Sequence, residues 1–126
     1  MKLKFGWMAA LALAAGVAVA AEEPILNVYN WNDYIAADTV PAFEKASGIE
    51  VRYDLYDSNA TLQGKLLTGG SGYDVVYPSV EYAGKQIQAG IFQPLDKSRL
   101  PNLVHIDPLI LEAVAVADPG NRHLVP

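Results

Sequence analysis

Four consecutive side chains early in the 126-residue chain carry an indole, an amide, a carboxylate and a phenol: Trp31, Asn32, Asp33 and Tyr34. A carboxylate can pair with an alkylammonium ion, and an amide oxygen can accept one of its N–H groups. Aromatic faces attract the cation, which gains roughly 0.5–2 kcal/mol over Trp or Tyr, and they also pack against a methylene chain. This cluster is therefore a candidate site for a small organic cation.

The same residues also have a purely structural interpretation. Trp31 and Tyr34 could be half-buried packing residues, and Asp33 could cap the helix that follows, because aromatics at strand ends commonly pack and Asp at loop ends commonly caps. Composition alone does not decide between binding and packing, so both interpretations stay open at this point.

Three strands are predicted around this cluster. Residues 25–30 form a short apolar strand directly before it. Residues 49–56 alternate between apolar and polar side chains, with Tyr56 on the polar face, which is the period of a strand with one buried face. Residues 73–77 form a third strand that Pro78 ends.

Helices are predicted between and after the strands, over residues 38–47, 59–68, 80–89 and 108–116, with glycines beyond the ends of the first three. Alternating strands and helices indicate βαβ units, which produce a parallel sheet with right-handed crossovers. The predicted fold class is therefore α/β. Residues 91–102 are predicted as an extended connection, 118–121 as a turn and 123–126 as the opening of another strand, so we expect a truncated chain.

Ligands in open α/β sheets bind beyond the carboxyl ends of the strands. Three loops meet that condition here, namely residues 31–34, 57–59 and 78–82, and we call them together the carboxyl rim. If the strands are neighbours, these loops lie side by side. They contain carboxylates, amides, hydroxyls and aromatic rings but no Lys or Arg, a composition that suits a cation.

Other motifs give no support for catalysis or metal binding. Gly64-Lys65 lacks the flanking residues of a phosphate-binding loop. Ser79 could act as a nucleophile only through a distant pairing with His105 or His123, and the two histidines lack metal-site spacing in a chain without Cys. We predict no enzymatic activity, no cofactor and no metal.

The first twenty residues have the pattern of a secretory signal peptide. Lys2 and Lys4 precede an apolar run over residues 5–19, and small residues allow cleavage near Ala20/Ala21. A transmembrane anchor is the alternative, but a span takes roughly 20 apolar residues and this run is shorter. Because the chain has no Cys, neither a lipid anchor on this segment nor a disulfide is expected.

The charge of the chain supports an exported protein with a cationic partner. Loss of Lys2 and Lys4 with the signal would leave seven basic and fourteen acidic residues, and the net charge would change from −5 to −7. An acidic domain disfavours nucleic acid and anionic headgroups, and favours small cations. We expect a bacterial periplasm as the location.

The segments "LNVYNWNDYIAADTV", "YDLYDSNATLQGKLLTGGSGYDVVYPS", "GKQIQAGIFQPLDKSRLP" and "DPGN" together resemble the periplasmic polyamine-binding proteins of ABC importers, closest to the putrescine-preferring branch. The resemblance covers residues 26–126. It implies a longer protein with two α/β lobes that close about a hinge, of which residues 21–126 would be the N-terminal part of the first lobe.

The resemblance also implies roles for individual residues. The family motif W-[ST]-D-Y falls on Trp31, Asn32, Asp33 and Tyr34, and the family's ligand-contacting serine falls on Ser79. In the family the aromatic pair packs on the polyamine chain, while aspartate and hydroxyl oxygens take an ammonium end.

Three further residues, Ser58, Glu81 and Tyr82, are predicted to lie near the ligand. This chain departs from the family pattern at Asn32, where Ser or Thr is usual, at Tyr77, where Val is usual, and at Glu81-Tyr82. Glu81 could add charge near the site or face solvent.

The predicted function is capture of a polyamine, putrescine first and spermidine second, by a monomeric binding protein that delivers it to an ABC permease in the inner membrane. Two alternatives stay open. One is a module that presents a bound polyamine to a membrane receptor, and the other is part of an α/β enzyme acting on a small cationic substrate.

Overall fold

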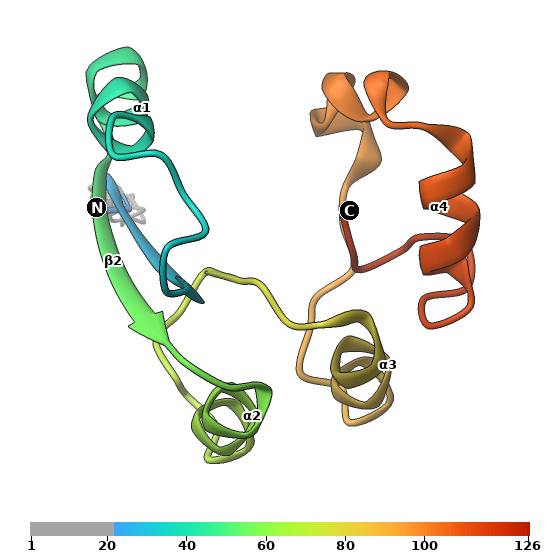
Figure 1. Cartoon of the computed structure of the whole chain (residues 1–126). Coiled ribbons are helices and arrows are strands. Elements are labelled where there is room, and N and C mark those ends of the chain that lie inside the picture. The colour runs from blue at the N-terminus through green and yellow to red at the C-terminus, as the bar shows by residue number, and fades with distance from the viewer. Residues whose placement is uncertain (1–21) are drawn as a thin grey trace, which may run out of the picture.

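The computed structural model describes residues 22–126, so the predicted signal peptide lies outside the described residues. Figure 1 shows the strands with α1 and α2 on one side of the molecule and α3 and α4 on the other. The elements in chain order are β1 (Ile25–Trp31), α1 (Thr39–Ser47), β2 (Glu50–Tyr56), α2 (Asn59–Leu67), β3 (Val75–Val76), α3 (Val80–Gln88), the 3-10 helices η1 (Lys97–Arg99) and η2 (Pro101–His105), and α4 (Pro108–Ala115).

The three strands form one parallel sheet in the order β2-β1-β3. β1 lies in the centre, and its register with β2 places Trp31 opposite Tyr56. The predicted α/β class and the parallel sheet are confirmed. Since β1 neighbours both other strands, the loops that follow the strands also meet the condition for a shared rim.

Capping explains why the helices begin and end where they do. Ser58 precedes α2, and its Oγ accepts a hydrogen bond from the N–H of Thr61 at 3.1 Å. α1 ends at Gly48, which has φ +73° and donates its N–H to the Glu44 carbonyl at 2.8 Å. This left-handed conformation suits glycine, so the sequence predicted the end of α1 correctly.

Aromatic side chains build the core between the sheet and α2. The Tyr29 ring meets the Tyr56 ring edge-on at 4.8 Å between centroids and stacks on Tyr73 at 4.5 Å. Leu62 and Leu66 from α2 close this cluster, and Leu62 is fully buried. The core therefore lies directly behind the carboxyl rim.

The predicted polar face of β2 is wrong at the end of the strand. Tyr56 is 4% exposed, whereas Leu55 on the expected apolar face is 52% exposed. Parallel sheets carry helices on both faces, and α2, which begins just after Tyr56, covers the face that the alternation pattern assigned to solvent.

β3 is shorter than the predicted strand over residues 73–77. Before it, Asp74 contacts Asn27 of β1 through one backbone bond, from its N–H to the Asn27 carbonyl at 2.9 Å, and through its carboxylate, which accepts from the Asn27 N–H at 2.8 Å in place of a second backbone bond. After it, the Tyr77 carbonyl accepts hydrogen bonds from side chains, and Pro78 has no N–H to donate. The ladder is therefore limited to Val75 and Val76.

The C-terminal segment differs from the prediction at two places. The connection over residues 91–102 includes η1 and the start of η2 rather than being extended throughout. Residues 123–126 are not a strand, because the N–H groups of His123 and Leu124 donate to the Asp118 carboxylate at 2.7 and 2.9 Å and are not free for a ladder. Among residues 22–126, no helix combines the length and apolarity needed to cross a bilayer.

Candidate functional site

Hydrogen bonds join the three loops of the carboxyl rim. The Asn32 N–H donates to the Tyr56 carbonyl at 3.2 Å, which continues the β1–β2 pairing into the first loop. The Trp31 indole Nε1 donates to the Tyr77 carbonyl at 2.8 Å, which joins the first loop to the residue directly before the third. The predicted shared rim is therefore present in the structure.

Asn59 joins the second loop to the third through both ends of its amide. Its Nδ2 donates to the Ser79 Oγ at 2.8 Å, and its Oδ1 accepts from the Ser79 N–H at 3.0 Å. Ser79 precedes α3, but its hydroxyl makes no capping hydrogen bond to that helix. Because a hydroxyl has one donor and two acceptor positions, Ser79 keeps an acceptor for a further N–H group.

The aromatic pair divides between packing and exposure. Trp31 is half-buried, and its ring lies 4.7 Å from the Tyr56 ring, so the packing interpretation accounts for part of it. Tyr34 is 76% exposed, and its ring centroid lies 6.0 Å from that of Trp31 with 35° between the planes. Burial in the described chain does not explain Tyr34.

Asp33 does not cap the following helix, so that alternative is wrong. The residue before α1 is Asp38, five positions further on. Asp33 is exposed, and within residues 22–126 its carboxylate accepts no hydrogen bond and forms no ion pair. Its φ is +58°, a left-handed conformation that Asp tolerates better than most residues.

The other three predicted residues contact protein groups. The Ser58 hydroxyl caps α2 through Thr61. Glu81 is exposed in the first turn of α3 and lines a cavity of about 400 Å³ between α3 and α4. The Tyr82 ring lies 5.4 Å from the Lys85 Nζ on the same helix. These contacts do not bring Ser58, Glu81 or Tyr82 together with the Trp31–Tyr34 pair.

Sequence reasoning missed Tyr56 as a contributor to the site. Its ring contacts Trp31, and its hydroxyl donates to the Tyr77 carbonyl. Burial raises the pKa of Tyr56 well above its ordinary value, and the neighbouring Tyr29 and Tyr53 add to the shift, so the hydroxyl keeps its proton. Pairing the two strands from their starting residues would have placed Tyr56 beside Trp31.

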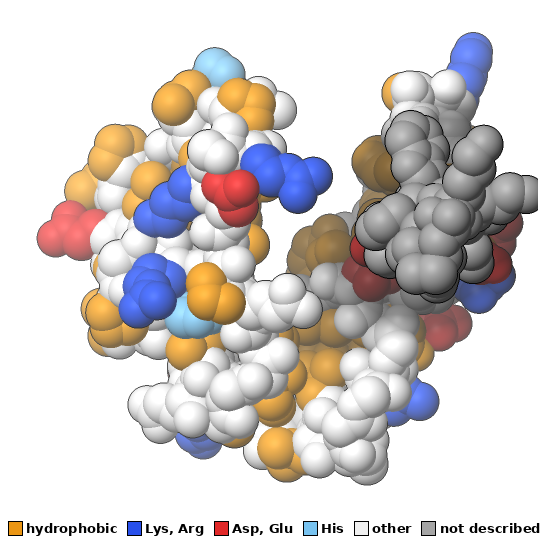
Figure 2. Space-filling model, turned by 180° about the vertical axis from the view of Figure 1, so that it is seen from behind, with side chains coloured by type: hydrophobic (Ala, Val, Ile, Leu, Met, Phe, Trp, Pro, Cys, Tyr) orange, Lys and Arg blue, Asp and Glu red, His pale blue; other side chains and the backbone are white. Residues whose placement is uncertain are grey.

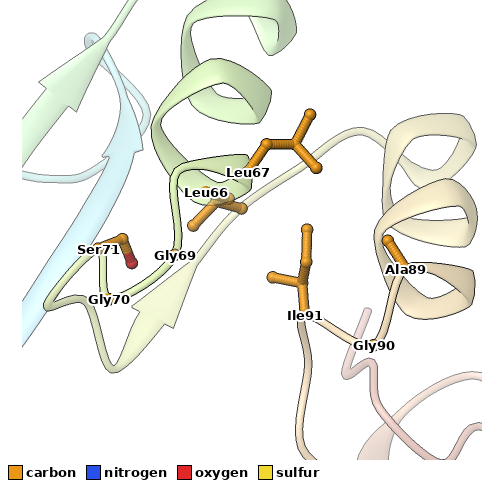
Figure 3. Close-up of a pocket in the computed structure, with 8 residues that line it drawn as sticks. All are labelled: Leu66, Leu67, Gly69, Gly70, Ser71, Ala89, Gly90 and Ile91. Atoms are coloured by element: carbon orange, nitrogen blue, oxygen red, sulfur yellow. The ribbon is translucent and has the colours of Figure 1, made fainter.

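A second cavity lies away from the carboxyl rim. It has a volume of about 390 Å³ and is formed near the C-terminal ends of α2 and α3 (Figure 3). None of the predicted site residues lines it. Its lining residues are Leu66, Leu67, Gly69, Gly70, Ser71, Ala89, Gly90 and Ile91. Among the described residues, no group of three His, Asp or Glu side chains gathers as a metal site requires.

Comparison with known proteins bears out the resemblance. The chain is 52% identical over 130 aligned residues to the putrescine-binding periplasmic protein SpuD of Pseudomonas aeruginosa, covering 100% of this chain and 35% of that protein. It is 49% identical over 125 residues to the putrescine-binding periplasmic protein PotF of Escherichia coli, covering 95% of this chain and 34% of the relative. The chain thus spans about a third of the length of these relatives.

The fold is similar to that of a solved substrate-binding protein. The spermidine/putrescine ABC transporter substrate-binding protein PotD of Streptococcus pneumoniae superposes with a TM-score of 0.77 at 34% identity, over 81% of this chain and 31% of that one. No family model matches the sequence. Similarity in sequence and in fold therefore confirms the predicted resemblance to the polyamine-binding proteins.

Proposed function

Because this chain resembles part of the periplasmic polyamine-binding proteins, we propose that its carboxyl rim forms one side of a polyamine site, with putrescine as the favoured ligand. The observation that carries the proposal is Asp33. It is an exposed carboxylate beside two aromatic rings, and it has no partner among residues 22–126. A carboxylate in that setting is suited to an ammonium group.

The proposed ligand contacts use the exposed carboxylate, the aromatic rings and the acceptor groups of the rim. One ammonium end pairs with Asp33 and donates to the Ser79 hydroxyl, while the methylene chain lies along Trp31 and Tyr34. The indole N–H of Trp31 already donates to the Tyr77 carbonyl, so the ligand meets the face of the ring and not a competing donor. Asn32 is exposed and offers a further amide oxygen.

The proposed role is transport without a chemical step. A monomeric protein captures the polyamine in the periplasm and presents it to an ABC permease in the inner membrane. In the two-lobed arrangement that the family resemblance implies, the second lobe holds the other end of the ligand and closes over it about a hinge. Names of the relatives, which refer to putrescine or spermidine binding in the periplasm, support this role.

Isothermal titration of putrescine into the full-length protein, with and without the Asp33→Asn substitution, tests the proposal. Asn also tolerates the left-handed backbone at this position, so the substitution removes charge without straining the loop. Loss of one partner of a desolvated charge pair costs about 2–5 kcal/mol, so we expect the dissociation constant to rise roughly 30-fold or more. Tyr34→Phe keeps the ring and should cost less.

Asp57→Asn is the matched control, because it removes the same charge from another rim loop. The Asp57 Oδ1 accepts a hydrogen bond from the Thr61 Oγ1, so it is engaged within its own helix cap. Equal losses for Asp33→Asn and Asp57→Asn would show only a general charge effect. Negligible losses in both would refute the role given to Asp33.

A further inference from the structure

A single backbone carbonyl connects the aromatic core with the carboxyl rim. The Tyr77 carbonyl accepts one hydrogen bond from the Trp31 Nε1 at 2.8 Å and a second from the Tyr56 hydroxyl. A carbonyl oxygen has two lone pairs, so it can serve both donors at once. The two side chains are also opposite each other in the β1–β2 register.

The sheet does not hold this carbonyl by itself. β3 pairs with β1 only at Val75 and Val76, so the regular ladder ends just before Tyr77. The following residue, Pro78, has no N–H with which to fix the peptide to a neighbouring strand. The position of the Tyr77 carbonyl therefore depends on the side chains that donate to it.

Tyr56 is well suited to hold the carbonyl in place. Its side chain is 4% exposed and packs edge-on against Tyr29 within the aromatic core, so the ring has little freedom. Burial keeps the hydroxyl protonated, and it remains a donor over the physiological pH range. Trp31 is less buried and lies at the edge of this core.

We propose that the Tyr56 hydroxyl is a positioning group that fixes the indole of Trp31 by holding the Tyr77 carbonyl to which the indole N–H donates. The bond keeps the polar edge of the indole directed at the protein and leaves the rest of the ring for the ligand. The part of this inference that concerns polyamine rests on the proposed function. Tyr56 itself touches no ligand in this arrangement.

An indole that is already fixed in the free protein loses less conformational entropy when the ligand binds. Immobilising one side chain upon binding typically weakens affinity about two- to tenfold. We therefore expect Tyr56→Phe, which keeps the ring and removes only the hydroxyl, to raise the dissociation constant for putrescine by about two- to tenfold. In the free protein we expect faster and wider motion of the Trp31 ring.

Trp31 can report its own motion, because it is the single Trp in residues 21–126, while Trp7 lies in the predicted signal peptide. In the mature full-length protein with any Trp beyond residue 126 replaced by Phe, time-resolved fluorescence anisotropy without ligand measures Trp31 alone. Putrescine titration of the same sample gives the affinity.

Tyr73→Phe is the matched control. It deletes a hydroxyl from a ring that stacks on Tyr29 in the same core, where the Tyr73 Oη donates to the Asp54 carboxylate at 2.8 Å. Tyr53→Phe is unsuitable, because the Asn30 amide that Tyr53 holds also accepts the Trp31 backbone N–H. The inference requires that Tyr56→Phe increases the motion of Trp31 and weakens binding, whereas Tyr73→Phe does neither, even if both lower the melting temperature. Unchanged Trp31 motion in Tyr56→Phe, or increased motion with unchanged affinity, overturns it.

Putrescine affinity tests the proposed function, and the anisotropy of Trp31 tests the role of Tyr56, so the two can fail independently. If the unsubstituted full-length protein does not bind putrescine, the proposed function fails, while the anisotropy of the free protein still decides whether Tyr56 fixes the indole. If Tyr56→Phe does not fold, hydrogen exchange of the Trp31 indole N–H and of the Tyr56 hydroxyl in the unsubstituted protein decides instead. Protection of both protons supports the inference, because both groups then donate to the held carbonyl, and exchange of either proton at the rate of the free group refutes it.

Discussion

The N-terminal and C-terminal parts of the described chain are each stabilised by a different kind of contact. Within residues 22–126, all buried hydrophobic side chains lie between positions 28 and 83, around the sheet, α2 and α3. Among residues 93–126, which include η1, η2 and α4 (Figure 1), the single buried side chain is the carboxylate of Asp118, which is 1% exposed. We call residues 25–92 the aromatic region and residues 93–126 the carboxylate region.

Polar contacts organise the carboxylate region. Asp118 accepts hydrogen bonds from the backbone N–H groups of His123 and Leu124 and from the His123 Nδ1 at 3.0 Å. The Lys97 Nζ donates to the Gly120 carbonyl at 2.7 Å, which joins this turn to η1. Apolar side chains are meanwhile spread over the surface of the half that carries α4 (Figure 2).

This difference shows that the apolar core and the candidate site share one region, while the other region depends on polar contacts. Every residue of the carboxyl rim belongs to the aromatic region, whose packing sets the position of Trp31. The carboxylate region contributes none of the predicted site residues. Changes in the two regions should therefore differ in size, in pH dependence and in their effect on the site.

The largest expected effect is in the aromatic core. Leu62→Ala removes a fully buried side chain and should lower the free energy of unfolding by about 2–5 kcal/mol, as large-to-small core substitutions do. Leu67→Ala on the same helix is the control, since Leu67 is 59% exposed, and it should cost about 0.5 kcal/mol or less. Urea denaturation measures both. Similar costs for the two would contradict the assignment of the core.

The next effect concerns the buried carboxylate. Asp118→Asn removes a charged acceptor of backbone N–H groups and should cost about 1.5–3 kcal/mol. Asp107→Asn is the control in the same region, because Asp107 caps α4 and Asn caps helices about equally well. Amide hydrogen exchange should show faster exchange at His123 and Leu124 in Asp118→Asn only. Faster exchange throughout the aromatic region would remove the distinction between the regions.

We expect acid to destabilise the carboxylate region before the aromatic region. Burial alone raises the pKa of Asp118, but hydrogen bonds from His123 and from backbone N–H groups outweigh it and hold the pKa below the ordinary value of 3.8. A lowered folded pKa stabilises the fold above the unfolded value, and this stabilisation is lost as the pH falls below about 4. Amide exchange between pH 5 and 3 should show this loss at His123. Asp118→Asn should show no such dependence there.

The smallest effect is expected at an exposed ion pair within the aromatic region. The Arg52 Nε and Glu50 Oε1 lie 3.5 Å apart, and the two side chains are 60% and 63% exposed. Glu50→Gln should therefore change the free energy of unfolding by less than about 0.5 kcal/mol. Thermal unfolding can measure this. A loss comparable to that of Asp118→Asn would mean that exposure does not decide the strength of polar contacts here.

The order of elements could be predicted from the sequence, because it depends on local signals. Gly48 ends α1 and Ser58 caps α2 through contacts within a few residues. The burial of Tyr56 could not be predicted, because the two-residue period shows that two faces differ but not that a helix covers each of them. The missing strand at 123–126 has a similar cause, since the Asp118 side chain takes the backbone donors.

The positions of Trp31, Asp33 and Ser79 on one rim could also be predicted, since they follow from the carboxyl ends of neighbouring strands. The hydrogen-bond partners that hold these loops could not be predicted. The bonds from Tyr56 to Tyr77 and from Asn59 to Ser79 join residues 21 and 20 positions apart, and they depend on register and on helix placement. The ligand contacts of these residues remain a prediction that binding measurements test.

The parallel sheet also gives the carboxyl rim an electrostatic conflict. α2 and α3 both begin there, and the N-terminus of a helix carries about half a positive charge. These two macrodipoles favour anions and oppose an ammonium ion. The full negative charges of Asp33, Asp57 and Glu81, all exposed at the rim, outweigh them. In the proposed site, the preference for a cation therefore depends on three carboxylates, and without them the same backbone would favour the opposite charge.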